Sequence, residues 1–185
     1  MTDVADAVVL PIRQQVDPFV GYKAVSLKLT KGGKIEVGGY VGTVTLDATA
    51  KCSAWPRPEV PHEAPDVNCK CGLYALDDAA DVSYGYRDTE HLATVELFGT
   101  VIVGETGWRA SRQRILDIAL GTSCRACDLF GDVRRAADAV YFSVTGDMLT
   151  LCAQHGELAV NLNAAIRQSP DDLTARLGVP VSWML

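Results

Sequence analysis

The sequence has no long apolar segment, no basic leader and no block of basic residues. Its longest apolar runs, such as residues 7–12 and 100–103, are far shorter than the roughly 20 residues that a membrane-spanning helix needs. We therefore expect no membrane association. The first residues include acids where a secretory signal carries basic side chains, so we expect a cytoplasmic protein. Lys and Arg are spread along a chain of formal net charge -6, which disfavours nucleic acid as the main partner.

Common catalytic motifs are also missing. The sequence has no nucleotide-binding glycine loop, no nucleophile elbow and no His-Glu-x-x-His pair. His91 precedes an expected strand and follows acidic residues, which favours a solvated or capping histidine over a catalytic base. The sequence shows no catalytic constellation, and a non-enzymatic function is favoured.

Cysteine, by contrast, is abundant for a chain expected in a reducing compartment, where disulfides persist poorly. The six cysteines fall into two groups of three, and each group includes one of the three histidines. This Cys3His composition is that of a closed structural zinc site. The first group is Cys52, His62, Cys69 and Cys71, and the second is Cys124, Cys127, Cys152 and His155.

The second group has the more regular spacing. Cys124-x2-Cys127 is followed after 24 residues by Cys152-x2-His155, a pattern typical of one tetrahedral zinc ion. Between the two pairs, residues 139–151 predict a short hairpin. The alternative is that the cysteines are buried small side chains and the histidine lies on the surface.

The element after the hairpin is expected to be a helix that begins at Cys152, with Leu158, Leu162 and Ile166 as its inner stripe. Cys152 and His155 would project from the same side of its first turn, where the helix N-terminus favours a thiolate. Knuckle, hairpin and ligand-bearing helix form a treble-clef-like pattern. Because all four ligands would come from the protein, we expect a structural site rather than a catalytic one.

The first group is less regular. Its spacing is Cys-x9-His-x6-Cys-x-Cys, and it flanks a stretch over residues 54–65 that contains four prolines. Proline removes backbone donors, so this stretch is expected to be a loop that needs an anchor. A second zinc ion would provide one. The alternatives are thiols packed in a β core and a strained redox pair of Cys69 and Cys71.

The first two thirds of the chain are rich in β patterns. Residues 24–29 alternate apolar and polar side chains, residues 31–34 form a glycine-containing turn, and residues 35–37 resume the strand. Residues 40–46 and 92–103 are rich in Val and Thr and predict further strands.

The remaining segments carry weaker or more local signals. Residues 77–87 are polar and are expected to form a surface connection, and residues 108–120 fit a helix or a strand. Ser169, Pro170 and Gly178 predict the start and end of a short terminal helix.

These patterns predict an α+β protein. We expect an extended lead-in over residues 1–20, a β-rich domain with the proline-rich Cys/His loop over 21–120, and a zinc-finger-like part over 121–185.

Four arginines make up the only concentration of basic residues in the sequence. Their neighbourhood holds as many acids as arginines, so a solvated, ion-paired face is the leading interpretation. In the alternative interpretation, these arginines contact the phosphates of a nucleic acid. The residues are Arg109, Arg112, Arg114 and Arg125.

Three motifs together resemble a protein family. They are His62-Glu-Ala-Pro-Asp-Val-Asn-Cys69-Lys-Cys71-Gly-Leu-Tyr-Ala, the strand Val95-Glu-Leu-Phe-Gly-Thr-Val and the turn Gly107-Trp-Arg-Ala. With the later Cys-x-x-Cys and Cys-x-x-His pairs, residues 21–155 are similar to a family of uncharacterised actinobacterial and actinophage proteins. The family carries no established activity.

The resemblance implies that the first Cys/His group acts as a unit, and it implies a phage or mobile-element origin. Residues 41–46 depart from the Trp-Pro-rich segment associated with the family at this point, so surfaces that face a partner there are expected to differ.

The function favoured by the sequence is that of a non-enzymatic, zinc-stabilised adaptor or regulatory protein that binds another protein. Two alternatives stay open. One is a nucleic-acid-binding zinc finger, and the other is a treble-clef zinc-dependent nuclease, which would need an open position on its metal.

Overall fold

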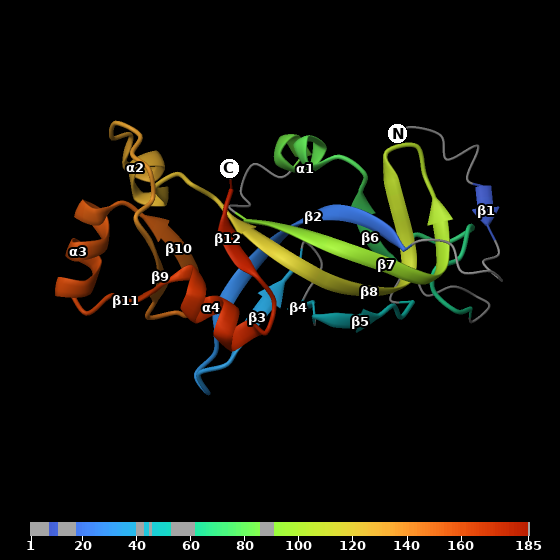
Figure 1. The fold of residues 1–185 in the computed structure, drawn as a ribbon, viewed down its shortest axis with the longest axis horizontal. Coiled ribbons are helices and arrows are strands. Elements are labelled where there is room, and N and C mark those ends of the chain that lie inside the picture. The colour runs from blue at the N-terminus through green and yellow to red at the C-terminus, as the bar shows by residue number, and fades with distance from the viewer. Residues whose placement is uncertain are drawn as a thin grey trace. The chain divides into compact units, whose positions relative to one another are not determined.

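The structure is a computed structural model that describes residues 8–10, 18–39, 43–44, 46–52, 62–85 and 91–184. It is a mixed α+β protein in which strands predominate (Figure 1). The chain divides into two compact units. Unit 1 comprises residues 1–23, 46–86 and 94–116, and unit 2 comprises residues 24–45, 87–93 and 117–185.

Three long strands contribute residues to both units. They are β2 (Phe19–Leu29), β7 (His91–Val103) and β8 (Gly107–Leu120). In unit 1, β7 and β8 are neighbours joined by a tight turn, in which the Gly104 N–H donates to the Gly107 carbonyl at 2.8 Å. The other edge of β8 pairs antiparallel with β6 (Leu73–Leu76) and then with β5 (Asp47–Thr49). β1 (Val8–Leu10) pairs with the end of β7.

The core of unit 1 follows from strand alternation. Val95, Leu97 and Val101 of β7 are fully buried. Gln113 and Ile115 of β8 are also buried, and their immediate neighbours along the strand are exposed. A period of two fits a strand with one covered face, so residues 108–120, which the sequence left undecided, form a strand.

Two further segments differ from the sequence-based expectation. The polar connection expected over residues 77–87 contains a helix, α1 (Ala79–Gly85). The expected proline-rich loop lies mostly outside the described residues. So do parts of the lead-in over 1–20 and of the strand expected over 40–46, of which β4 (Thr43–Val44) is described.

Unit 2 begins with a hairpin. Residues 26–29 of β2 pair antiparallel with β3 (Ile35–Gly38), as the sequence predicts, and β4 extends the ladder. The Thr30 N–H donates to the Lys34 carbonyl at 2.8 Å, and Gly33 takes a left-handed conformation at φ 77. Glycine adopts this conformation without steric cost. In the same unit, β12 (Val181–Trp183) pairs parallel with residues 118–120 of β8.

The remaining elements of unit 2 form a small antiparallel sheet with helices packed against it. β9 (Ala139–Ser143) and β10 (Met148–Leu151) form the hairpin predicted over 139–151, and β11 (Ala165–Gln168) pairs with the other edge of β9. α3 (Ala153–Asn161) packs on this sheet, and α2 (Arg125–Phe130) contacts β10 (Figure 1). The predicted terminal helix is confirmed as α4 (Pro170–Leu177).

The caps of α4 are those expected from the sequence. The Asp172 N–H donates to the Ser169 side chain, and the Asp172 carboxylate accepts from the Ser169 N–H, which satisfies two exposed backbone donors. Gly178 ends the helix at φ 74.

The prediction of one helix from Cys152 to Ile166 is wrong for the second half of this segment. α3 ends at Asn161, and its expected inner stripe of Leu158, Leu162 and Ile166 is 55%, 68% and 60% exposed. Asn163 adopts φ 52, a left-handed conformation that stops a helix, and Ile166 pairs with Phe142 in the sheet. Pairing with β9 therefore decides the structure of this segment.

His91 is also placed differently from the expectation of a solvated side chain. It is 4% exposed, and its Nδ1 accepts a long hydrogen bond from the Gly121 N–H at 3.4 Å. It faces the interior because it begins the buried side of the alternation in β7.

Candidate metal centres

The second Cys/His group is held by the N-termini of two helices. Cys124 is the N-cap of α2 and Cys127 lies in its first turn, while Cys152 is the N-cap of α3 and His155 lies in its first turn. The exposed backbone amides of a helix N-terminus stabilise negative charge, so both helices favour thiolates here. The Cys-x2-Cys and Cys-x2-His spacings place both side chains of each pair toward the same point.

The ligand atoms of this group converge. Nδ1 of His155 lies 3.4, 3.6 and 3.5 Å from the Sγ atoms of Cys124, Cys127 and Cys152. A tetrahedral zinc ion with ordinary bond lengths would place its nitrogen and sulfur ligands roughly 3.6 Å apart. The four ligand atoms lie within 4.8 Å of one another, and the three cysteines are 1%, 1% and 4% exposed. The group could thus hold one metal ion, as predicted from the spacing.

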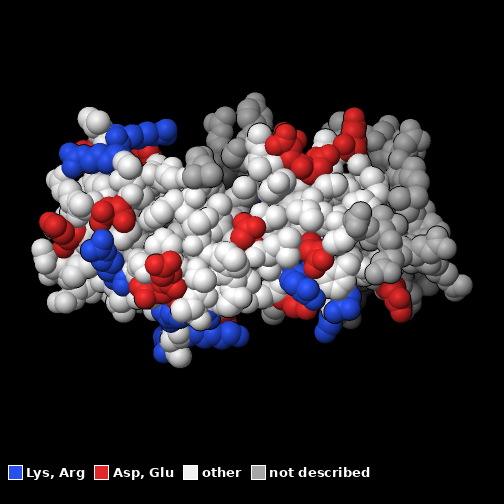
Figure 2. Space-filling model, in the orientation of Figure 1, with Lys and Arg blue, Asp and Glu red and all other residues white. Residues whose placement is uncertain are grey.

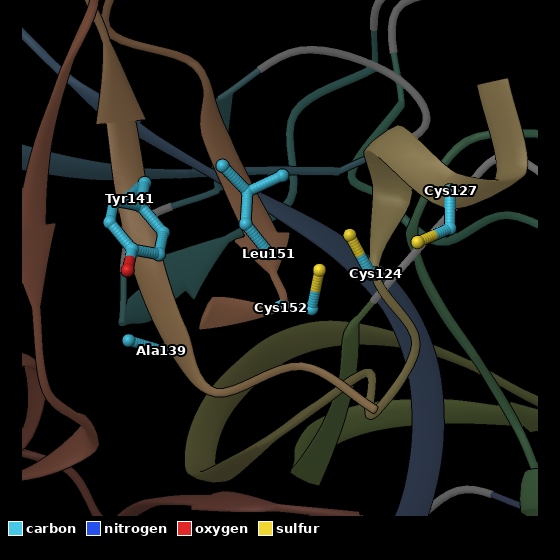
Figure 3. Close-up of a cluster of buried hydrophobic side chains, with 6 residues drawn as sticks. All are labelled: Cys124, Cys127, Ala139, Tyr141, Leu151 and Cys152. Carbon is cyan, nitrogen blue, oxygen red and sulfur yellow. The ribbon is translucent and has the colours of Figure 1, made fainter. Parts of the chain in front are cut away.

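The surroundings of the second group fix its shape. Figure 3 shows the three sulfurs on the same side of Leu151, with Tyr141 on its other side. The cysteines form a buried apolar cluster with these two residues and Ala139. A side chain at Gly156 would overlap the Tyr141 ring, so glycine lets the first turn of α3 approach β9 closely. Asp132 Oδ2 lies 3.5 Å from His155 Nε2 and can orient the ring for ligation through Nδ1.

The thiols of the second group hold their protons unequally. The pKa of Cys127 is raised to about 11, mainly by burial and further by the neighbouring Cys124. Burial also acts to raise the pKa of Cys124, but hydrogen bonds from the backbone of Cys152 and Cys127 lower it overall. A divalent cation would displace these protons, because metal ligation requires thiolates.

The first Cys/His group is carried by loops. Cys52 follows β5, and His62, Cys69 and Cys71 precede β6, all outside helices and strands. Sγ of Cys52 lies 3.7 Å from Sγ of Cys69, and His62 Nε2 lies 3.3 Å from Sγ of Cys71. Two sulfurs on a tetrahedral zinc ion would be roughly 3.8 Å apart. All four ligand atoms lie within 4.8 Å of one another, so this group could also hold a metal ion.

Arg109 of β8 ties this loop to the sheet, a role that the sequence did not indicate. Its guanidinium donates to the carbonyl oxygens of Cys69 and Cys71, the latter at 3.2 Å, and lies 5.8 Å from the centre of the Tyr74 ring. Gly72 adopts φ +129, and a Cβ there would lie 2.5 Å from Arg109 Cγ. The Cys-x-Cys-Gly and Gly-x-Arg-Ala motifs, noted only as points of resemblance, thus meet at this contact.

The other arginines have different surroundings from Arg109. Arg112 and Arg114 pair with Asp47 at 4.0 Å each, and Arg114 also pairs with Glu96 at 3.6 Å. These ion pairs fit the ion-paired interpretation for these two residues. Arg125 belongs to unit 2, at the start of α2. On the face shown in Figure 2, basic side chains form small separate groups with acids among them.

None of the six cysteines forms a disulfide, so every thiol is available as a ligand. No helix within the described residues is long and apolar enough to cross a membrane. No protein-family model, curated protein or solved structure matches the chain. The two candidate metal centres therefore rest on the chain's own geometry, and the family resemblance stays a prediction.

Proposed function

We propose that the chain is a zinc protein in which each Cys/His group binds one Zn2+ ion. The three nearly equal distances from His155 Nδ1 to the sulfurs of the second group carry this proposal. Thiolate and imidazole ligands in a tetrahedral arrangement suit zinc, whereas calcium and magnesium take oxygen ligands. The order of knuckle, hairpin and helix supports a treble-clef-like finger around the second ion.

Both ions would be structural. Each group supplies four protein ligands, which fills a tetrahedral shell and leaves no position for an activated water. A zinc nuclease needs such a position, so the observed ligand sets favour a non-enzymatic protein.

The role best supported for this scaffold is binding another protein, as an adaptor or regulator. Leu129, Phe130 and Val133, next to the second centre, are 65%, 76% and 83% exposed. Exposed apolar side chains grouped along a short segment are a feature of protein-binding surfaces. Nucleic acid is the weaker alternative, because Arg112 and Arg114 already pair with acids and Arg109 with carbonyl groups. The resemblance suggests that the protein itself is of phage or mobile-element origin.

Cobalt substitution tests whether the centres are closed. The protein would be refolded with two equivalents of Co2+, and its visible spectrum recorded before and after azide is added. Closed Cys3His shells predict an intense tetrahedral spectrum that azide does not change. A spectrum that shifts on azide binding would reveal an open position and favour the nuclease alternative.

The protein-binding role is tested by the pair of substitutions Phe130→Ser and Val133→Ser, with Val20→Ser in unit 1 as a matched exposed control. Each protein would be immobilised and incubated with a nuclease-treated extract of the organism that encodes the chain. A protein retained by wild type and by the control, but lost with the double variant, is the expected result. A protein that is retained from an untreated extract but not from the nuclease-treated one would point to nucleic acid instead.

A further inference from the structure

The two candidate centres differ in how far their sulfurs are shielded. All three cysteines of the second group are buried, whereas Cys52 and Cys69 of the first group are only half-buried. We propose that the first centre is a reversible oxidation site, at which a peroxide joins Cys52 and Cys69 in a disulfide and releases zinc. The second centre keeps its ion under the same conditions. This inference rests on the proposed binding of zinc at both groups.

Geometry selects the two sulfurs that react. Sγ of Cys52 and Sγ of Cys69 are 3.7 Å apart, so rotation of the side chains can bring them to bonding distance. Cys71 is 7% exposed and its sulfur lies against His62 at 3.3 Å. A bond between Cys69 and Cys71 would span a single residue and strain the disulfide. The pair Cys52 and Cys69 is therefore both the nearer to solvent and the less strained.

The segments that carry the ligands also favour oxidation at the first group. The first group lies wholly on loops, while the second is anchored at the first turns of α2 and α3. Loop segments open at lower free energy than packed helices. Reagents therefore reach the sulfurs of the first group more easily. The rate of cysteine oxidation depends on thiolate character and solvent access, so the first group should be oxidised first.

The reaction balances with hydrogen peroxide as the oxidant. One thiolate attacks a peroxide oxygen, the O–O bond breaks, and a sulfenic acid and hydroxide form. The second thiolate attacks the sulfenic sulfur, forming the S–S bond and releasing a second hydroxide. Two protons from solvent convert the hydroxides to water, so two thiolates lose two electrons in total. The remaining ligands, His62 and Cys71, are too few to retain zinc, which leaves as the aqueous ion.

The test uses the full chain purified with its metal. Zinc would be counted first, and the protein then treated with limiting hydrogen peroxide while a chromogenic chelator reports released zinc. We expect one equivalent of zinc per chain to be released, with Cys52 and Cys69 found in one disulfide-linked peptide pair by mass spectrometry. Dithiothreitol and added zinc should restore the starting state.

Two matched variants separate the disulfide from general damage. Cys52→His keeps four zinc ligands but removes one partner of the disulfide, so release by peroxide should slow by about tenfold or more. Cys71→His makes the same exchange but leaves the reacting pair intact, and release should stay near the wild-type rate. If Cys52→His fails to fold, the disulfide map of the wild-type protein still decides the matter.

The outcomes distinguish this inference from the function on which it rests. Protein purified without zinc would overturn the proposed zinc centres themselves. Protein with two zinc ions that releases none, releases first from the second centre, or forms no bond between Cys52 and Cys69 would overturn the oxidation site alone.

Discussion

Lys23 is a polar side chain in an unusual place within unit 1. Burial lowers its pKa to about 8, and its Nζ donates to Gln113 Oε1 at 3.1 Å. Gln113 is fully buried, and its side-chain NH2 group has no hydrogen-bond partner among the described residues. A charged lysine is therefore held at some cost in a region where the polar groups are incompletely paired.

The lowered pKa predicts that stability rises with pH. Between about pH 8 and 10.5 the unfolded chain binds the Lys23 proton more tightly than the folded chain, so the free energy of unfolding increases across this window. The full gain would be about 3 kcal/mol. It is measured as the difference between wild type and Lys23→Met in urea unfolding at several pH values, which cancels groups common to both. Parallel pH profiles for the two proteins would contradict the assignment.

Arg109 is predicted to position the ligands of the first centre. Arg109→Met removes the donors that hold the carbonyl groups of Cys69 and Cys71, so zinc affinity at the first centre should fall by about 10–100-fold. Competition with a chelator of known affinity measures this on the full chain. Arg112→Met, which removes an exposed ion pair on the same strand, should leave both affinities unchanged. Equal effects of the two substitutions would show that Arg109 acts only through overall charge.

At the scale of elements, the close approach of α3 to β9 decides whether the second centre can form. Gly156→Ala would place a methyl group into the Tyr141 ring. Overpacking of this kind costs about 1–3 kcal/mol and outweighs the gain in helix propensity. Thermal unfolding should show a lower midpoint than wild type. Gly32→Ala in the hairpin of the same unit serves as the control, because its Cβ would meet Thr30 Oγ1 at 3.9 Å, an ordinary contact distance, and its midpoint should stay near that of wild type. A midpoint for Gly156→Ala at or above wild type would show that α3 can move away from β9.

The elements predicted correctly from the sequence are those with local signals. The hairpin over 139–151 and α4 each have a turn or cap that fixes their ends. The prediction of a helix through Ile166 was wrong. Three apolar residues at a spacing of four fit one face of a helix, but the spacing does not show which element packs against that face. Partner strands decide such cases, and the pairing of β11 with β9 joins residues more than twenty positions apart. The same reason applies to residues 108–120, whose strand is fixed by its neighbours on both edges.

At the scale of the whole molecule, both candidate centres could be predicted from the sequence. Zinc binding needs only a few residues, and they must be of particular types such as Cys and His. The structure brings together all four residues of each group, as the spacing indicated. The contact of Arg109 with the first group could not be derived, since it joins positions 38 and 40 residues apart through backbone oxygens. Backbone acceptors leave no signature in residue type.

The presence of two zinc centres is tested most directly by the number of zinc ions bound per chain, measured by native mass spectrometry with elemental analysis of the same sample. We expect two ions for wild type and one for each of Cys124→Ser and Cys69→Ser, because each substitution breaks one closed shell. The variant that retains only the second centre should keep the ion bound by Cys124, Cys127, Cys152 and His155. Wild-type protein purified without zinc, or with the cysteines of the second group in disulfides, would show that the proposed zinc centres are wrong.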